Sequence, residues 1–85
     1  MTSTTPAISV LTPVWNGLPF LKECVESVFS QSFQDWEHII SDNGSTDGTR
    51  DYLDSLPGDS RRRLFKQEKN LGIGGNLDFL VYNAR

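Results

Sequence analysis

Three short apolar runs alternate along the chain with three stretches in which apolar residues recur at helical spacing. The apolar runs predict strands at residues 8–14, 37–41 and 64–67. The recurring apolar positions predict helices at residues 20–31, at about 47–56, and from 76 to the end. Strands and helices that alternate in this way form right-handed crossover units. The pattern therefore predicts an α/β fold with a Rossmann-like parallel sheet and helices on both faces.

Residues at the element ends indicate where the helices begin and stop. Pro19 lies where the first turn of a helix tolerates proline. Ser45 or Thr46 is expected to cap the second helix through its side-chain oxygen. Pro57 and Gly58 are expected to end that helix, because neither residue continues a helical pattern well.

The chain has 85 residues, which is near the lower size limit for one self-sufficient core. We expect a disordered lead at residues 1–7 and one domain over residues 8–85. The last predicted helix has no fourth strand to which it could return. A three-stranded parallel sheet leaves an edge and a flank that a complete domain normally covers, so the domain is expected to be truncated.

Polar residues and glycines gather at the carboxyl ends of the three predicted strands, at residues 12–16, 42–47 and 69–75. Ligands of open α/β sheets bind at this edge. Trp15 can plug the core there, or it can stack on a planar ring such as a nucleobase. Asp42 can accept a hydrogen bond from the N–H of a nucleobase, or it can cap its own loop as an Asx turn. The residues alone leave both choices open.

Composition excludes several classes of protein. A net charge of −3 argues against a nucleic-acid partner, and we interpret the basic run at residues 61–63 as a solvated turn. One cysteine cannot build a disulfide framework. No apolar run approaches the roughly 18 to 20 residues of a membrane helix, and residues 1–6 lack the pattern of a secretion signal. We therefore expect a cytoplasmic protein.

His38 and Cys24 are the residues whose side chains most often act as a base or a nucleophile. His38 falls inside the second predicted strand, Cys24 falls inside the first predicted helix, and no nucleophile elbow lies nearby in the sequence. Both are expected to have structural roles, Cys24 as a small core residue.

Four segments, taken in order, resemble a known enzyme family. They read ISVLTPVWNG at residues 8–17, SQSF and then WE within 30–37, ISDNGSTDGT at 40–49, and NLG at 70–72. In this order and spacing they resemble the front half of a family 2 glycosyltransferase of the GT-A fold. The resemblance covers residues 8–85 and implies a partial nucleotide-sugar-binding domain.

The resemblance implies a nucleotide site on seven residues: Thr12, Pro13, Trp15, Asp42, Asn43, Asn70 and Gly72. In such enzymes the first strand end lines the base pocket, with the aromatic residue packed on the base. The pair after the second strand bonds the base edge, and the third loop borders the same site. Many members carry an aspartate where this chain has Asn43 and an arginine where it has Leu77. The resemblance therefore does not identify the base, and it transfers no phosphate contact.

The activity that the resemblance implies is inverting transfer of a sugar from a nucleotide-diphosphate sugar to the hydroxyl of a glycan or lipid-linked acceptor, in polysaccharide or cell-envelope synthesis. Peripheral membrane association of the full-length protein is compatible with that role. Family members hold a divalent cation, Mn or Mg, with a D-x-D motif and use a later aspartate as base. No two of this chain's seven aspartates are separated by one residue. We therefore assign no metal ligand and no catalytic residue, and we expect the chain alone to be inactive. The alternative is a non-catalytic nucleotide-binding remnant or interaction module.

Overall fold

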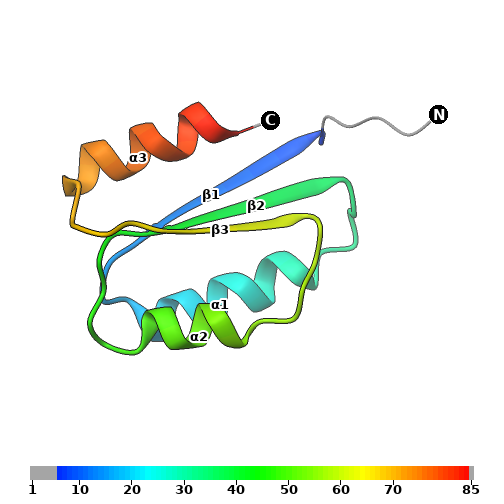
Figure 1. The fold of residues 1–85 in the computed structure, drawn as a ribbon. Coiled ribbons are helices and arrows are strands. Elements are labelled where there is room, and N and C mark those ends of the chain that lie inside the picture. The colour runs from blue at the N-terminus through cyan, green and yellow to red at the C-terminus, as the bar shows by residue number, and fades with distance from the viewer. Residues whose placement is uncertain (1–5, 85) are drawn as a thin grey trace.

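Three parallel strands form the middle layer of the computed structural model, which describes residues 6–84 (Figure 1). The strands are β1 (Ile8–Val14), β2 (Trp36–Asp42) and β3 (Arg62–Lys66), paired in the order β1-β2-β3. The helices are α1 (Leu18–Phe29), α2 (Thr49–Ser55) and α3 (Gly72–Asn83). Helices α1 and α2 cover one face of the sheet, and α3 covers the other. The predicted α/β fold with alternating strands and helices is confirmed.

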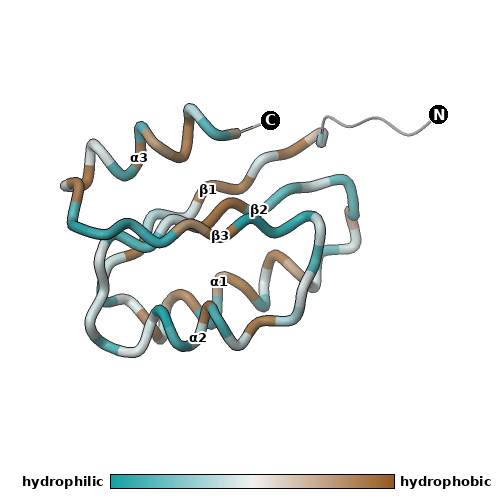
Figure 2. The backbone as a smooth tube through the Cα atoms, in the orientation of Figure 1, coloured by the Kyte–Doolittle hydropathy of each residue, from teal (hydrophilic) through white to brown (hydrophobic). Residues whose placement is uncertain are grey.

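The central strand β2 organises the core, because all seven of its residues are buried. Ile40 packs with Val14 and with residues of α1 and α2 on one face of the sheet. Ile39 is equally buried, and it projects to the opposite face because successive strand side chains alternate. Hydrophobic positions accordingly run along the middle of the sheet, whereas the segment between β3 and α3 is hydrophilic (Figure 2).

Helix α1 is held to the sheet by Leu21 and Val25, which lie one turn apart and are both buried. Complete burial of a side chain of this size stabilises the fold by about 1.5–3 kcal/mol. Pro19 lies in the first turn, as predicted. The helix begins and ends two residues before the predicted limits, and the chain leaves it at Ser30, whose hydroxyl donates to the Glu26 carbonyl at 2.8 Å.

The predicted caps of α2 are wrong. Gly48, with a φ of 96°, precedes the helix, and the Asp47 carboxylate accepts the Thr49 amide hydrogen at 3.0 Å. The Ser45 hydroxyl instead accepts the amide hydrogen of Asn16 at 2.8 Å and so joins the first two loops. The Ser45 side chain, which was predicted to cap α2, thus makes a long-range hydrogen bond instead.

The basic run is not a solvated turn throughout, because Arg62 and Arg63 form the start of β3. Arg61 precedes the strand, and its guanidinium lies 4.0 Å from the centroid of the Trp36 ring. It also pairs with the Asp59 carboxylate at 2.9 Å. Arg62 and Arg63 thus lie in a strand that the charge of this segment does not indicate.

Helix α3 begins at Gly72, four residues before the predicted start. Of the predicted lead at residues 1–7, only Pro6 and Ala7 belong to the described part of the chain, where they precede β1; the rest lies outside it. Within residues 6–84, no helix is both long enough and apolar enough to cross a membrane.

Candidate functional site

A hollow of about 160 Å³ lies where β1 and β2 end, next to the start of α3. Its lining consists of Pro13, Val14, Trp15, Asn43, Ile73 and Asn76. Trp15 is 57% exposed, so much of its indole surface is open to contact. Since ligands of α/β sheets bind at the carboxyl ends of the strands, this hollow is the candidate functional site.

Asn43 connects the hollow to the loop before α3. Its Oδ1 accepts the amide hydrogen of Leu71 at 2.7 Å, while its Nδ2 donates to Asn70 Oδ1 at 3.1 Å and to the Gly72 carbonyl at 3.3 Å. Asn70 Oδ1 also accepts the Gly72 amide hydrogen at 2.7 Å. Side chains from two strand ends therefore form one hydrogen-bonded network.

The backbone of these two loops approaches closely at Gly44. A Cβ at this position would lie 3.3 Å from the Asn70 amide nitrogen, and Gly44 has a φ of +86°. Both the space and the backbone conformation favour glycine here.

Asp42 lies next to Asn43 in the sequence, but its side chain is fully buried among other partners. Its Oδ2 accepts the Ser45 amide hydrogen at 3.2 Å and the Arg50 Nε hydrogen at 2.6 Å. Arg50 also donates to the Gln67 carbonyl, which joins the start of α2 to the end of β3. The bond to Ser45 spans three residues, one more than in the Asx turn that the sequence left open for Asp42, and the carboxylate is engaged within the fold.

Thr12 also directs its hydroxyl into the protein. Thr12 Oγ1 lies 2.8 Å from His38 Nε2 and 3.5 Å from Cys24 Sγ. Burial lowers the pKa of His38 to about 4, and the positive charge of Arg62 adds to this effect. A neutral imidazole gives a thiolate no cationic partner. His38 is buried, whereas Cys24 is only half-buried and is not in the hydrophobic core cluster in which it was expected.

The structure brings together five of the seven residues predicted for the nucleotide site: Pro13, Trp15, Asn43, Asn70 and Gly72. The side chains of Thr12 and Asp42 bond elsewhere. Their roles toward a ligand stay predictions.

Two lining residues, Ile73 and Asn76, were not predicted as site residues, because Ile73 falls in a predicted loop and Asn76 was predicted only as the start of the last helix. Asn76 is 2% exposed, and its Nδ2 donates to the Ser41 carbonyl at 3.0 Å. Its spacing of four residues from the buried Leu80 was the available signal for an inward-facing helical position.

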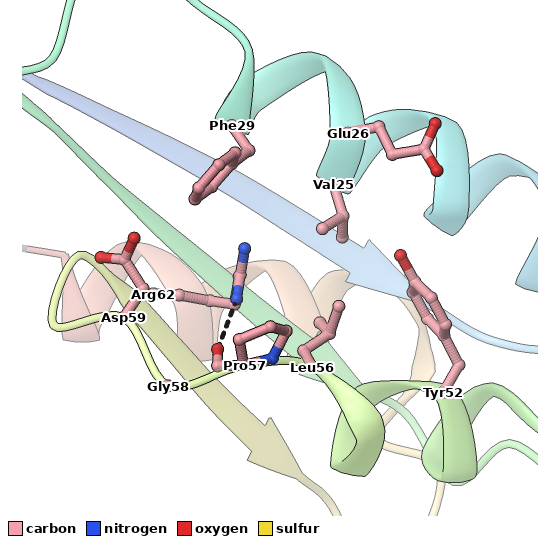
Figure 3. A pocket seen from close by; sticks show the side chains of 9 residues that line it. All are labelled: Val25, Glu26, Phe29, Tyr52, Leu56, Pro57, Gly58, Asp59 and Arg62. Atoms are coloured by element: carbon pink, nitrogen blue, oxygen red, sulfur yellow. Dashed lines mark hydrogen bonds between the residues drawn. The ribbon is translucent and has the colours of Figure 1, made fainter.

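A larger hollow of about 420 Å³ lies between α1 and α2, as Figure 3 shows. Val25, Phe29, Tyr52 and Leu56 supply most of its apolar lining. Arg62 extends into it, and its Nη1 donates to the Pro57 carbonyl at 2.9 Å. This hollow is formed by helix side chains and the turn after α2, away from the residues that end β1 and β2, so it is not the site predicted from the strand ends.

No group of three histidine, cysteine, aspartate or glutamate side chains within residues 6–84 is placed to hold a metal ion. The described side chains thus do not fit a divalent cation, and no chemical step through a cation can be derived from them.

The sequence pattern of the glycosyl transferase family 2 matches residues 9–85. The chain belongs to this family. It is 39% identical over 75 residues to the glycosyltransferase GlyG of Streptococcus pneumoniae, a match that covers 78% of this chain and 25% of GlyG. It is 38% identical over 80 residues to a chondroitin synthase of Escherichia coli, covering 94% of this chain and 12% of the synthase. The chain therefore spans about a quarter of one family 2 relative and about an eighth of the other.

Among solved structures, the fold resembles a mannosyltransferase from Pyrobaculum calidifontis in complex with GDP-Man and Mn²⁺. The TM-score is 0.77 at 24% identity, and the match covers 98% of this chain and 26% of the mannosyltransferase. This likeness confirms that the fold of this family 2 chain is that of part of a GT-A glycosyltransferase.

Proposed function

We propose that this chain forms the donor-binding part of an inverting glycosyltransferase. The donor is a nucleotide-diphosphate sugar, the acceptor is a hydroxyl of a glycan or a lipid-linked glycan, and the product belongs to polysaccharide or cell-envelope synthesis. Membership of family 2 supports the class of reaction. The name of the chondroitin synthase and the GDP-Man bound by the mannosyltransferase support the acceptor class and the donor class, respectively.

The hollow at the ends of β1 and β2 is the observation that carries this proposal. Pockets that enclose a drug-sized ligand measure about 300–1,000 Å³. A hollow of about 160 Å³ suits one planar ring system, so the base enters it and the diphosphate and sugar extend outside. The exposed indole of Trp15 offers a face on which a base can stack, which contributes about 1–3 kcal/mol per base in other proteins.

Pro13 and Ile73 contribute apolar wall to the hollow, and the loop of Asn70 and Gly72 lies at its rim. In our proposal Thr12 and Asp42 support the same site from the other face of the sheet, through the bonds described above. A divalent cation, when bound, neutralises the charge on a leaving diphosphate. We assign that cation no ligand among residues 6–84.

A titration followed by ¹H–¹⁵N NMR tests the proposal, with UDP, GDP and dTDP as separate ligands. We expect at least one of them to shift the amide signals of residues 12–16, 42–45 and 70–75. The Trp15→Ala variant should weaken binding about five- to a hundredfold, as expected for the loss of one stacked base. Tyr82→Ala is the matched control, because Tyr82 is also an exposed aromatic residue and does not line the hollow.

Shifts scattered over the rest of the chain would contradict the assigned site, and equal losses in the two variants would contradict stacking on Trp15. Binding of a nucleotide together with failure to transfer its sugar to any acceptor would favour the non-catalytic binding module. Sugar transfer by the 85-residue chain would instead contradict the expectation that it is inactive alone.

A further inference from the structure

The hydrogen bonds of the Asn43 side chain nearly exhaust its capacity. A primary amide offers two N–H donors and one carbonyl oxygen with two lone pairs. Both donors of Asn43 are used, toward Asn70 Oδ1 and the Gly72 carbonyl, and one lone pair accepts from Leu71. Only 4% of Asn43 is exposed. The side chain therefore has no donor left for a ligand in the adjoining hollow.

We propose that Asn43 is a positioning residue, which holds the 70–72 loop at the rim of the hollow and does not read the base through its amide donors. This inference rests on the proposed function for the identity of the ligand, but the contacts themselves exist in the free protein. The three bonds act on consecutive residues, from Asn70 to Gly72.

The same bonds determine where α3 begins. Leu71 directly precedes the helix, and Gly72 is its first residue, with a φ of +77°. Fixing these two residues fixes the first turn of α3, and with it the place of Ile73 in the lining of the hollow. Asn43 thus shapes the hollow through the helix start as well as through the loop.

The surroundings of this loop explain why it needs an anchor. Asn70, Leu71 and Gly72 are exposed, so their local burial contributes little to keeping them in place. The buried side chain of Asn43 makes three hydrogen bonds to this loop, and these bonds hold the loop in place where packing does not. Gly44 allows the close approach on which this depends, because a Cβ there would press on the Asn70 backbone.

Two substitutions at Asn43 separate positioning from base recognition. Asn43→Ala removes all three bonds, whereas Asn43→Asp has nearly the same shape, keeps the acceptor for Leu71 and removes both donors. Asn83→Ala is the matched control, because the Asn83 amide also donates to a backbone carbonyl, that of Phe79, but near the far end of α3.

The first measurement needs no ligand. Amide hydrogen exchange of Leu71 should become at least about tenfold faster in Asn43→Ala, because its acceptor is lost. In Asn43→Asp the amide signals of residues 70–72 should move, since a carboxylate then faces two acceptors, Asn70 Oδ1 and the Gly72 carbonyl. Exchange within β2 and the signals of α1 should stay as in the parent chain, which shows that each variant is folded.

The second measurement compares the dissociation constants of UDP and GDP. If Asn43 acts through the loop, each variant weakens UDP and GDP by the same factor as each other, at least about fivefold for the two bonds lost in Asn43→Asp and the three lost in Asn43→Ala. If the amide donors of Asn43 read the base, the ratio of the two constants changes in Asn43→Asp, which lacks these donors, and the proposal is overturned. Parent-like exchange and signals at residues 70–72 in both variants would overturn it as well.

Failure of the proposed function gives a different result. In that case the parent chain binds neither nucleotide, and the exchange of Leu71 alone decides whether Asn43 positions the loop.

Discussion

Replacing Arg50 should destabilise the fold far more than its place on a short helix suggests. Arg50 Nε donates to the fully buried Asp42 carboxylate at 2.6 Å, and a second nitrogen donates to the Gln67 carbonyl. In Arg50→Ala the Asp42 carboxylate stays buried, and the Ser45 amide remains as a hydrogen-bond donor to it. An unpaired charge in the interior is costly because the fold cannot solvate it.

The magnitude follows from the burial of the two partners. Removing one partner of a fully buried ion pair costs about 3–5 kcal/mol. The Arg50 side chain is 35% exposed, so water screens the pair and enters the space that the guanidinium leaves. We therefore expect a loss of about 2–3 kcal/mol in the free energy of unfolding, or roughly 8–24 °C in Tm for a domain of this size.

Lys66→Ala is the matched control. Lys66 also pairs with an aspartate at 2.5 Å, Asp54, but both side chains are exposed, by 40% and 59%. Exposed pairs contribute about 0–1 kcal/mol. Urea unfolding followed by far-UV circular dichroism measures both variants. Equal losses in Arg50→Ala and Lys66→Ala would refute the argument that burial of the carboxylate makes the Arg50 pair important.

Two further predictions concern the backbone and the buried histidine. Gly44→Ala should cost about 1–3 kcal/mol, because it adds a Cβ 3.3 Å from the Asn70 amide nitrogen at a positive φ, whereas Gly58→Ala, which has open space, should be nearly neutral in the same urea titration. His38 has a pKa of about 4 in the folded protein against 6.5 for the free side chain, so the unfolded chain binds more protons between these values. The free energy of unfolding should therefore fall by up to about 3 kcal/mol as the pH drops from 6.5 toward 4. The His38→Gln variant should lack this part of the pH dependence. An identical slope in that variant would show that other groups cause it.

The order of elements could be predicted because apolar patterning determines it. The run that contains Ile39 and Ile40 has few alternatives to a buried strand, and the structure places both side chains in the interior. The start of α3 could not be predicted in the same way. Gly72, Gly74 and Gly75 suggest a loop by composition, yet hydrogen bonds from a residue some thirty positions earlier, Asn43, stabilise the first helical turn.

The candidate site was predicted as a set of residues but not as a geometry. A resemblance in sequence carries residue identities, and it does not say toward which face each side chain points. Asp42 ends β2, and its side chain bonds to Arg50 of α2, whereas the side chain of Asn43, the next residue, bonds to the loop before α3. The alternation of side chains along β1 separates Thr12 from Pro13 in the same way. The arginines at the start of β3 were misjudged because their partners, the Asn83 and Pro57 carbonyls, lie outside the strand itself.

The opposite directions of Asp42 and Asn43 have a consequence for how β2 finds its place between its neighbours. A shift of one residue in strand register exchanges the two faces of a strand. Such a shift leaves an isoleucine at one of the two positions that Ile39 and Ile40 now occupy, and it brings a polar neighbour, His38 or Ser41, to the other. At the end of the strand the shift would, depending on its direction, turn the Asn43 amide toward Arg50 or the Asp42 carboxylate toward the carbonyl of Gly72. Asp42 and the adjoining Asn43 thus raise the cost of a wrong alignment of β2, in addition to the cost set by its buried isoleucines.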